Sequence, residues 1–186
     1  MTTLTLIHVA IGLVAILSGF VVLFGMLAGK RLDGWTPIFL TTTVLTSVTG
    51  FFFPRHHIMP SHIIGIISLA VLAAAIYALY IQHLVGAWRK TYVITGVIAL
   101  YLNVFVLIVQ LFLKIPALKA LAPTQAEPPF KVTQLVVLVL FVVLGIFATI
   151  RFQPGPVSQG SYSPNQTNKT QDRNHHNGDV YEKSAK

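Results

Sequence analysis

The chain of 186 residues contains no cysteine. Disulfide bonds, thiolate metal sites, iron–sulfur clusters and a cysteine nucleophile are therefore excluded. Charged residues are also scarce, because Asp, Glu, Lys and Arg make up 10% of the chain, against roughly 25% in ordinary soluble domains. A soluble protein of this length needs far more polar surface, so the composition indicates a protein that lies in a lipid bilayer.

Acidic residues number only five, and none lies inside a long apolar block. Ionisable groups within a membrane mark ion pathways and proton relays. Their absence argues against a carboxylate-driven pump and against an intramembrane protease with paired aspartates. The chain also has no H-E-x-x-H, P-loop, G-x-G-x-x-G or G-x-S-x-G motif. We therefore expect a protein that is not an enzyme.

Long apolar blocks dominate what is present. A bilayer core about 30 Å thick needs roughly 20 apolar residues as a helix. Five blocks of about this length, separated by charged or proline-containing turns, predict an all-α integral membrane bundle of about five transmembrane helices over residues 1–151. The predicted spans are 4–28, 36–53, 61–87, 91–113 and 132–150.

The segments outside these blocks differ from one another. Residues 152–186 are rich in Ser, Asn, Gln, Gly, Pro and His, and contain hardly an aliphatic residue. Such a segment cannot bury enough surface to offset its ordering entropy, so we predict a disordered polar tail. The loop from Lys114 to Lys131 contains the apolar stretch 115–122, which we expect to lie along the membrane surface as a short helix.

Basic residues exceed acidic ones by eight and lie at the ends of the apolar blocks. Nucleic-acid binding is not expected, because it needs such residues clustered on a soluble domain. If the N-terminus is outside, the cytoplasmic side carries Lys30, Arg31, Arg89, Lys90, Arg151 and the bases of the tail. The outer side then carries Arg55, Lys114, Lys119 and Lys131. The positive-inside rule favours this orientation, with a cytoplasmic C-terminus.

Two histidines are the candidate cofactor ligands. His8 lies near the start of the first span and His62 opens the third, so both fall in the outer leaflet. Two helices that each offer a histidine at one depth can hold haem b, which would make the protein an electron carrier. The simpler interpretation is that these are interfacial histidines bonded to backbone or lipid headgroups.

The fourth span carries a polar seam. Gly96, Asn103 and Gln110 are spaced by seven residues and therefore share one face of the helix. Such residues commonly form hydrogen bonds between membrane helices, and we favour this packing role. The alternative is a substrate site in which Gln110 and Gln134 converge with the two histidines near the outer surface. Asn103, Gln110 and Gln134 are thus candidate substrate-binding residues.

The second span is rich in threonine, which membrane helices tolerate because its hydroxyl can bond to the carbonyl four residues earlier. Tight packing of small residues explains this composition. A small-solute channel or transporter lined by Thr42, Thr46, Asn103 and Gln110 is the alternative.

Four stretches resemble a group of small bacterial inner-membrane proteins of uncharacterised function: KRLDGWT (30–36), LTSVTGFFFP (45–54), ALYLNVFV (99–106) and KALAPTQ (119–125). The resemblance covers roughly residues 4–150. It implies a bacterial inner-membrane location and no activity. The helix layout is also similar to the cytochrome b561-like group, but that group uses paired histidines for two haems and this chain has no second pair.

The leading hypothesis is therefore a non-enzymatic accessory or scaffold component. Its expected partners are the lipid bilayer, other copies of itself or other membrane proteins. The abundance of small-residue packing faces supports this hypothesis, because such faces let helices approach closely.

Overall fold

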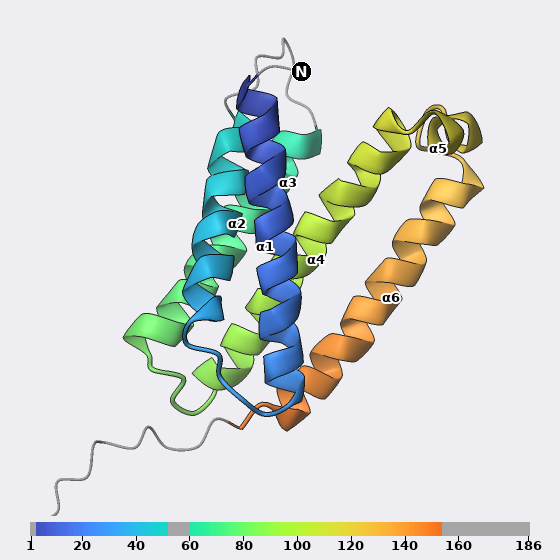
Figure 1. The fold of residues 1–186 in the computed structure, drawn as a ribbon. Coiled ribbons are helices and arrows are strands. Elements are labelled where there is room, and N and C mark those ends of the chain that lie inside the picture. Colours follow the sequence, from blue (N-terminus) through green and yellow to red (C-terminus); the bar gives the residue numbers. More distant parts are fainter. Residues whose placement is uncertain (1–2, 52–59, 154–186) are drawn as a thin grey trace, which may run out of the picture. The chain divides into compact units, whose positions relative to one another are not determined.

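The computed structural model describes residues 3–51 and 60–153, and every regular element in these ranges is helical (Figure 1). The elements are α1 (Thr3–Leu27), α2 (Trp35–Phe51), α3 (Pro60–Ile76), the π-helical turn η1 (Tyr77–Ile81), α4 (Trp88–Lys114), α5 (Pro116–Leu121) and α6 (Pro128–Arg151). The predicted all-α fold class is confirmed. The predicted disordered tail lies outside the described residues from residue 154 onward.

Four helices are long and apolar enough to cross a membrane: α1, α3 continued by η1, α4 and α6. They correspond to the first, third, fourth and fifth predicted spans. The second span corresponds to α2, which has 17 residues and measures about 25 Å, less than the roughly 30 Å of a bilayer core. Residues 52–59, which follow it, lie outside the described residues. The described part of the chain therefore has four helices of membrane length rather than five.

The third predicted span ends earlier than expected. The helix was expected to continue to residue 87, but it widens into η1 and stops at Ile81, and α4 begins at Trp88 rather than at residue 91. His83 and Leu84 take positive φ angles of 47° and 61°, and Gly86 one of 58°. Such backbone angles cannot continue a right-handed helix. The segment has no charged residue and no proline, so its sequence did not predict a turn.

Two aromatic side chains brace this turn. The Gln82 side-chain amide donates a hydrogen bond to the Tyr77 hydroxyl at 2.9 Å. The Tyr77 ring also packs edge-on against Trp88, with ring centroids 5.2 Å apart. Both sides of the turn are thereby joined to each other, which holds the end of α3 against the beginning of α4.

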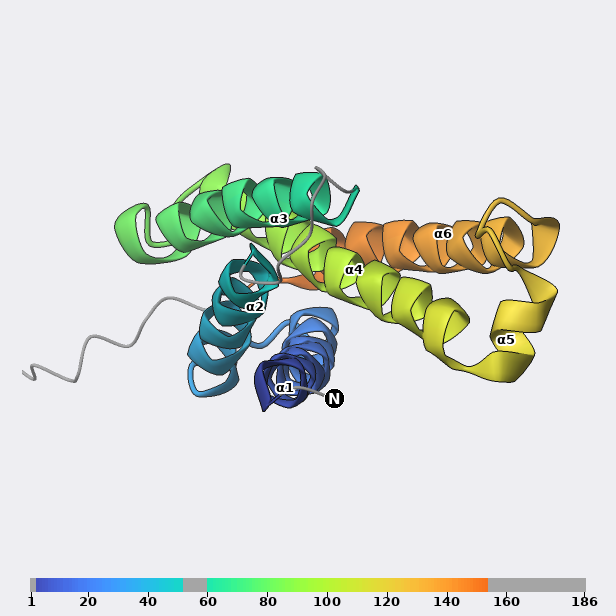
Figure 2. The same ribbon diagram turned by 90° about the horizontal axis from the view of Figure 1, so that it is seen from above.

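Successive long helices run antiparallel to one another and pack around α4 (Figures 1 and 2). α1 lies along α2, α2 along α3, and α3 along α4, while α6 packs mainly on α4 and α1. The largest buried cluster joins α1, α2, α3, α4 and α6, and its members include Leu23, Phe39, Leu72, Leu100 and Phe141. Towards α5, α4 leans away from α1 and α2, so the end of α4 next to α5 has fewer neighbours (Figure 1).

α6 is held along one narrow seam. Its buried residues are Gln134, Phe141 and Ala148, which are seven residues apart and therefore lie in one row. Phe141 packs against Phe20 of α1 and Tyr101 of α4, with ring centroids 6.1 and 5.8 Å apart. Most other aliphatic side chains of α6 are exposed, so the rest of the helix faces lipid.

Candidate functional site

The polar seam of α4 faces the helices on which it packs. Asn103 donates a hydrogen bond from Nδ2 to the hydroxyl of Thr43 in α2, at 3.1 Å, and Thr43 is completely buried. Gly96 lies under α1, because a Cβ atom at this position would be 3.5 Å from the Met26 methyl group. The packing role predicted for Asn103 and Gly96 is thus confirmed.

Gln110 does not continue this contact. It shares the face of Gly96 and Asn103, but it is exposed, because it lies where α4 leans away from α1 and α2 (Figure 1). The spacing of seven residues correctly places the three residues on one face. It gives no information on how far along the helix that face remains covered.

Gln134 joins α6 to α4. Its Nε2 atom donates to the backbone carbonyl of Phe105 at 3.3 Å, and the residue is only 8% exposed. Its Oε1 atom is buried without a hydrogen-bond partner among the described residues. Asn103 and Gln134 therefore bond to different helices, and Gln110 is exposed. Their role as substrate-binding residues stays a prediction.

His8 is packed against α2. Its Nδ1 atom lies 2.8 Å from the hydroxyl of Thr49, and a Cβ atom at Gly50 would be 3.8 Å from its Cε1. The backbone of His62 lies in the first turn of α3, and its side chain is outside the described residues. The described residues hold no group of three or more His, Cys, Asp or Glu side chains that could bind a metal ion.

The threonine hydroxyls of α2 mostly bond to their own helix. Thr42, Thr46 and Thr49 donate to the carbonyls four residues earlier, at 2.6 to 2.8 Å. Each of these hydroxyls thus has a hydrogen-bond acceptor in its own helix and needs no water molecule. The free-energy cost of placing these threonines in an apolar environment is therefore low.

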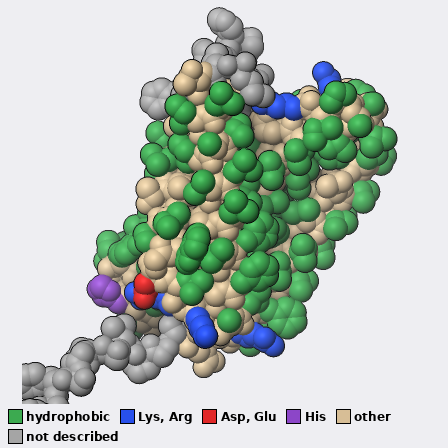
Figure 3. Space-filling model, in the orientation of Figure 1, with side chains coloured by type: hydrophobic (Ala, Val, Ile, Leu, Met, Phe, Trp, Pro, Cys, Tyr) green, Lys and Arg blue, Asp and Glu red, His purple; other side chains and the backbone are tan. Residues whose placement is uncertain are grey.

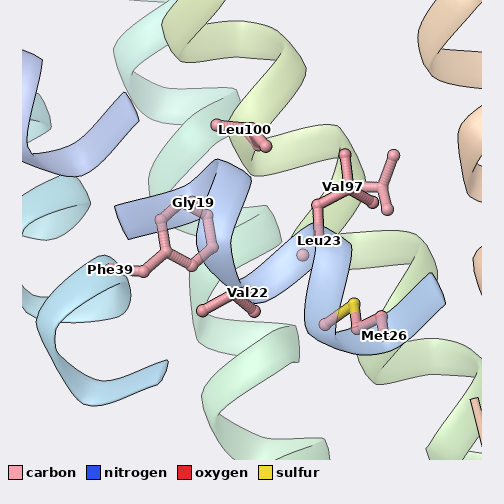
Figure 4. Close-up of a pocket in the computed structure, with 8 residues that line it drawn as sticks. Gly19, Val22, Leu23, Met26, Phe39, Val97 and Leu100 are labelled. Atoms are coloured by element: carbon pink, nitrogen blue, oxygen red, sulfur yellow. The ribbon is translucent and has the colours of Figure 1, made fainter. Parts of the chain in front are cut away.

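The centre of the bundle is closed. Phe39 of α2 and Leu100 of α4 close around Gly19 of α1 (Figure 4). The cavity between them measures only about 10 Å³, about the space of one water molecule. A Cβ atom at Gly19 would lie 2.5 Å from Leu100 and 2.8 Å from Phe39, so glycine allows this close approach.

The charged side chains lie at the two ends of the apolar surface (Figure 3). One end, which we call the basic end, carries Lys30, Arg31, Arg89, Lys90 and Arg151, with Asp33 paired to Arg31. The other end, which we call the loop end, carries Lys114, Lys119, Lys131 and Glu127. The net formal charge of the described side chains is therefore +4 at the basic end (five minus one) and +2 at the loop end (three minus one).

Tyr92 is buried at the basic end, where it joins α4 to the start of α2 and to the residue after α6. This burial was not predicted from the sequence. Its hydroxyl lies 3.4 Å from that of Thr36 at the start of α2, and its ring packs on Phe152 just after α6, with centroids 5.9 Å apart. Tyr92 is 2% exposed and Phe152 1%. An aromatic residue next to a basic pair resembles an interfacial anchor, so this burial could not be predicted from the local sequence.

The connection between α4 and α6 is an ordered loop. The predicted surface helix is α5, which begins with Pro116, and α6 begins with Pro128, in both cases at a position where proline's missing donor costs nothing. The side chain of Gln125 donates to the carbonyl of Val109 at 3.1 Å. The loop is therefore fixed to α4.

Glu127 completes this loop. Thr124 donates to its Oε1 atom from its hydroxyl at 2.8 Å and from its backbone N–H at 3.1 Å. Desolvation raises the pKa of Glu127, but these hydrogen bonds to the charged form outweigh it and hold the pKa below its ordinary value of 4.5. The loop is thus most stable when Glu127 is ionised.

No protein family, no curated protein and no solved structure matches the chain. The resemblance to small bacterial inner-membrane proteins stays an expectation.

Proposed function

We propose that the protein is a multi-pass accessory or scaffold component of a bacterial inner membrane, without catalytic activity of its own. The observation that carries this proposal is the contrast between the inside and the outside of the bundle. Inside, Asn103 and Gln134 are used in bonds between helices, and the central cavity holds about one water molecule. Outside, α6 presents an apolar face that its own bundle leaves uncovered.

The orientation we propose has the N-terminus outside and the C-terminus in the cytoplasm, and it requires α2 to cross the bilayer together with the four longer helices. The charge difference between the two ends, +4 against +2 among the described side chains, supports it by the positive-inside rule. Reporter fusions at both termini and at the loop end test it. We expect a cytoplasmic signal from the C-terminus alone, and a cytoplasmic loop end would contradict the orientation.

Copurification from membranes tests the scaffold role. Two differently tagged copies are expressed together in bacteria, and the membranes are solubilised in mild detergent. We expect the tagged chain to capture its second copy or a discrete membrane partner. Leu140→Trp, on the outward face of α6 where Leu140 is 52% exposed, should reduce this capture.

Leu17→Trp on α1 is the matched control, because Leu17 is also lipid-facing, at 67% exposed, but on another helix. It should leave capture unchanged. A wild-type chain that stays monomeric and captures no partner would contradict the scaffold role.

Binding of haem b is a second candidate, and one observation favours it. Haem-ligating histidines usually have one ring nitrogen fixed by a hydrogen bond, and Thr49 contacts Nδ1 of His8. An absorption spectrum of protein purified from haem-supplied cells tests this candidate. A Soret band that is lost in His8→Ala and in His62→Ala would establish it, and a colourless protein would exclude it.

A further inference from the structure

The outer surfaces of α4 and α6 enclose an open groove. Its volume is about 440 Å³, and only apolar atoms line it. Ile94, Ile98 and Tyr101 of α4 form one side, and Leu138, Val142 and Ile146 of α6 form the other. The hydroxyl of Thr149, which also lines the groove, is bonded to the carbonyl of Gly145 at 2.7 Å. The groove therefore presents no hydrogen-bonding group to its occupant.

Gly145 contributes to the depth of the groove. A Cβ atom at this position would be 3.3 Å from Val97 Cγ1, so the missing side chain lets α6 lie close to α4. α4 and α6 lie close together at Gly145 and separate towards α5 (Figure 1). The groove thus follows from the packing of two neighbouring helices and is not a gap between separate units.

The groove has the length of one leaflet. Its lining runs from Ile94 to Tyr101 on α4 and from Leu138 to Ile150 on α6. These stretches measure about 10 and 18 Å at 1.5 Å per residue, close to half of a bilayer core of roughly 30 Å. Such a length fits one lipid acyl chain and is too short for a second helix that crosses the whole membrane.

The groove reaches the basic end, because its lining includes Ile94 near the start of α4 and Ile150 next to the end of α6. Lys90 is exposed and lies four residues before Ile94, on the same face of α4. Arg151 follows Ile150 directly and ends α6. The contact between Tyr92 and Phe152 shows that the first turn of α4 and the end of α6 lie together. Two positive charges are therefore placed where the headgroup of a lipid in the groove would lie.

We infer that this groove binds one acyl chain of an anionic phospholipid, whose phosphate Lys90 and Arg151 hold at the basic end. The inference rests on the proposed membrane location and orientation, because anionic lipids give the cytoplasmic leaflet its negative surface potential. The complementarity of charge decides between lipid classes, since an apolar groove alone would accept any acyl chain.

Native mass spectrometry of the full chain in mild detergent tests this inference. The probes are phosphatidylglycerol and phosphatidylcholine with the same acyl chains. We expect phosphatidylglycerol to be retained and phosphatidylcholine to be largely lost. Lys90→Gln with Arg151→Gln should weaken phosphatidylglycerol binding about tenfold or more, since each basic residue near anionic lipid contributes about 1 kcal/mol. Lys119→Gln at the loop end is the control and should change nothing.

A second pair of variants tests the groove itself. Ile146→Trp fills it from α6, whereas Phe147→Trp places the same side chain on the neighbouring residue, which does not line the groove. Ile146 and Phe147 are 56% and 51% exposed, so neither change disturbs the core. We expect only Ile146→Trp to lose the lipid.

Three results would overturn the inference. The first is equal retention of both lipids, and the second is unchanged lipid retention in Ile146→Trp. The third is that a second copy of the chain, rather than lipid, occupies the groove and is lost in Ile146→Trp. Membrane fractionation and copurification are measured on the same material. A chain that fractionates with membranes and captures its partner, yet retains no anionic lipid, contradicts this inference alone and leaves the proposed function standing.

Discussion

Replacing Gln134 by leucine should stabilise the protein, although it removes a hydrogen bond between helices. The bond to the Phe105 carbonyl is long, at 3.3 Å, and such bonds contribute about 0.6 kcal/mol on average within membranes. The buried Oε1 atom has no partner among the described residues, and an unsatisfied group of this kind costs about 1–3 kcal/mol. The net gain for Gln134→Leu is therefore about 1 kcal/mol.

The size of leucine suits this position. Phe130 and Val137 lie one turn before and after Gln134 and pack on a small apolar cluster with Ile108 and Phe112 of α4. A leucine of similar volume extends this cluster and leaves no cavity. Volume-conserving changes of this kind usually cost little.

Unfolding in mixed detergent micelles, followed by tryptophan fluorescence, measures the change. Asn103→Leu is the comparison, because its bond to Thr43 is 3.1 Å long and the described residues show no unsatisfied atom on it. That variant should lose about 0.6 kcal/mol, and up to about 1.7. A loss of 1 kcal/mol or more in Gln134→Leu would refute the reasoning, because it would mean that Oε1 has a partner, such as an ordered water.

Three further predictions concern single positions. Gly19→Ala should cost about 1–3 kcal/mol in the same assay, because its Cβ atom would overlap α2 and α4, whereas Gly34→Ala, which meets nothing within 4 Å, should be neutral. Gly86→Ala should cost about 1 kcal/mol or more, because φ is +58° there, and its thermal midpoint measures this. The stabilising contribution of ionised Glu127 is fully present above its ordinary pKa of 4.5 and is lost as the pH falls through its lowered pKa, so the NMR shift of the Thr124 amide should titrate below pH 4.5 and stop titrating in Glu127→Gln.

The fold class could be predicted because lipid-length apolar blocks admit few structures other than helices. The role of Asn103 was also predictable, since a polar residue in a repeat of seven must face another helix or remain unsatisfied. These predictions depend only on local composition and helical period, which the sequence states directly.

The remaining features depend on contacts between distant segments. The turn at residues 82–87 interrupts a long apolar block with only Gln82, His83 and Gly86 as signals, and bonds such as that between Gln82 and Tyr77 fix it. The exposure of Gln110 follows from the tilt of α4, which packing of whole helices sets. The burial of Tyr92 needs Phe152, 60 residues later in the chain, which no local pattern indicates.

Because α6 is attached to the bundle along a single row of residues, we expect it to separate first when the chain is under tension. If an atomic-force tip pulled the chain from its C-terminal end, α6 would leave the bilayer first, after Phe152 separated from Tyr92. α1 to α4 would stay together, because they contribute most of the main buried cluster, to which α6 adds Phe141 and Ala148. The force trace would then begin with one separate rupture, in which the 24 residues of α6 unravel before any other helix moves.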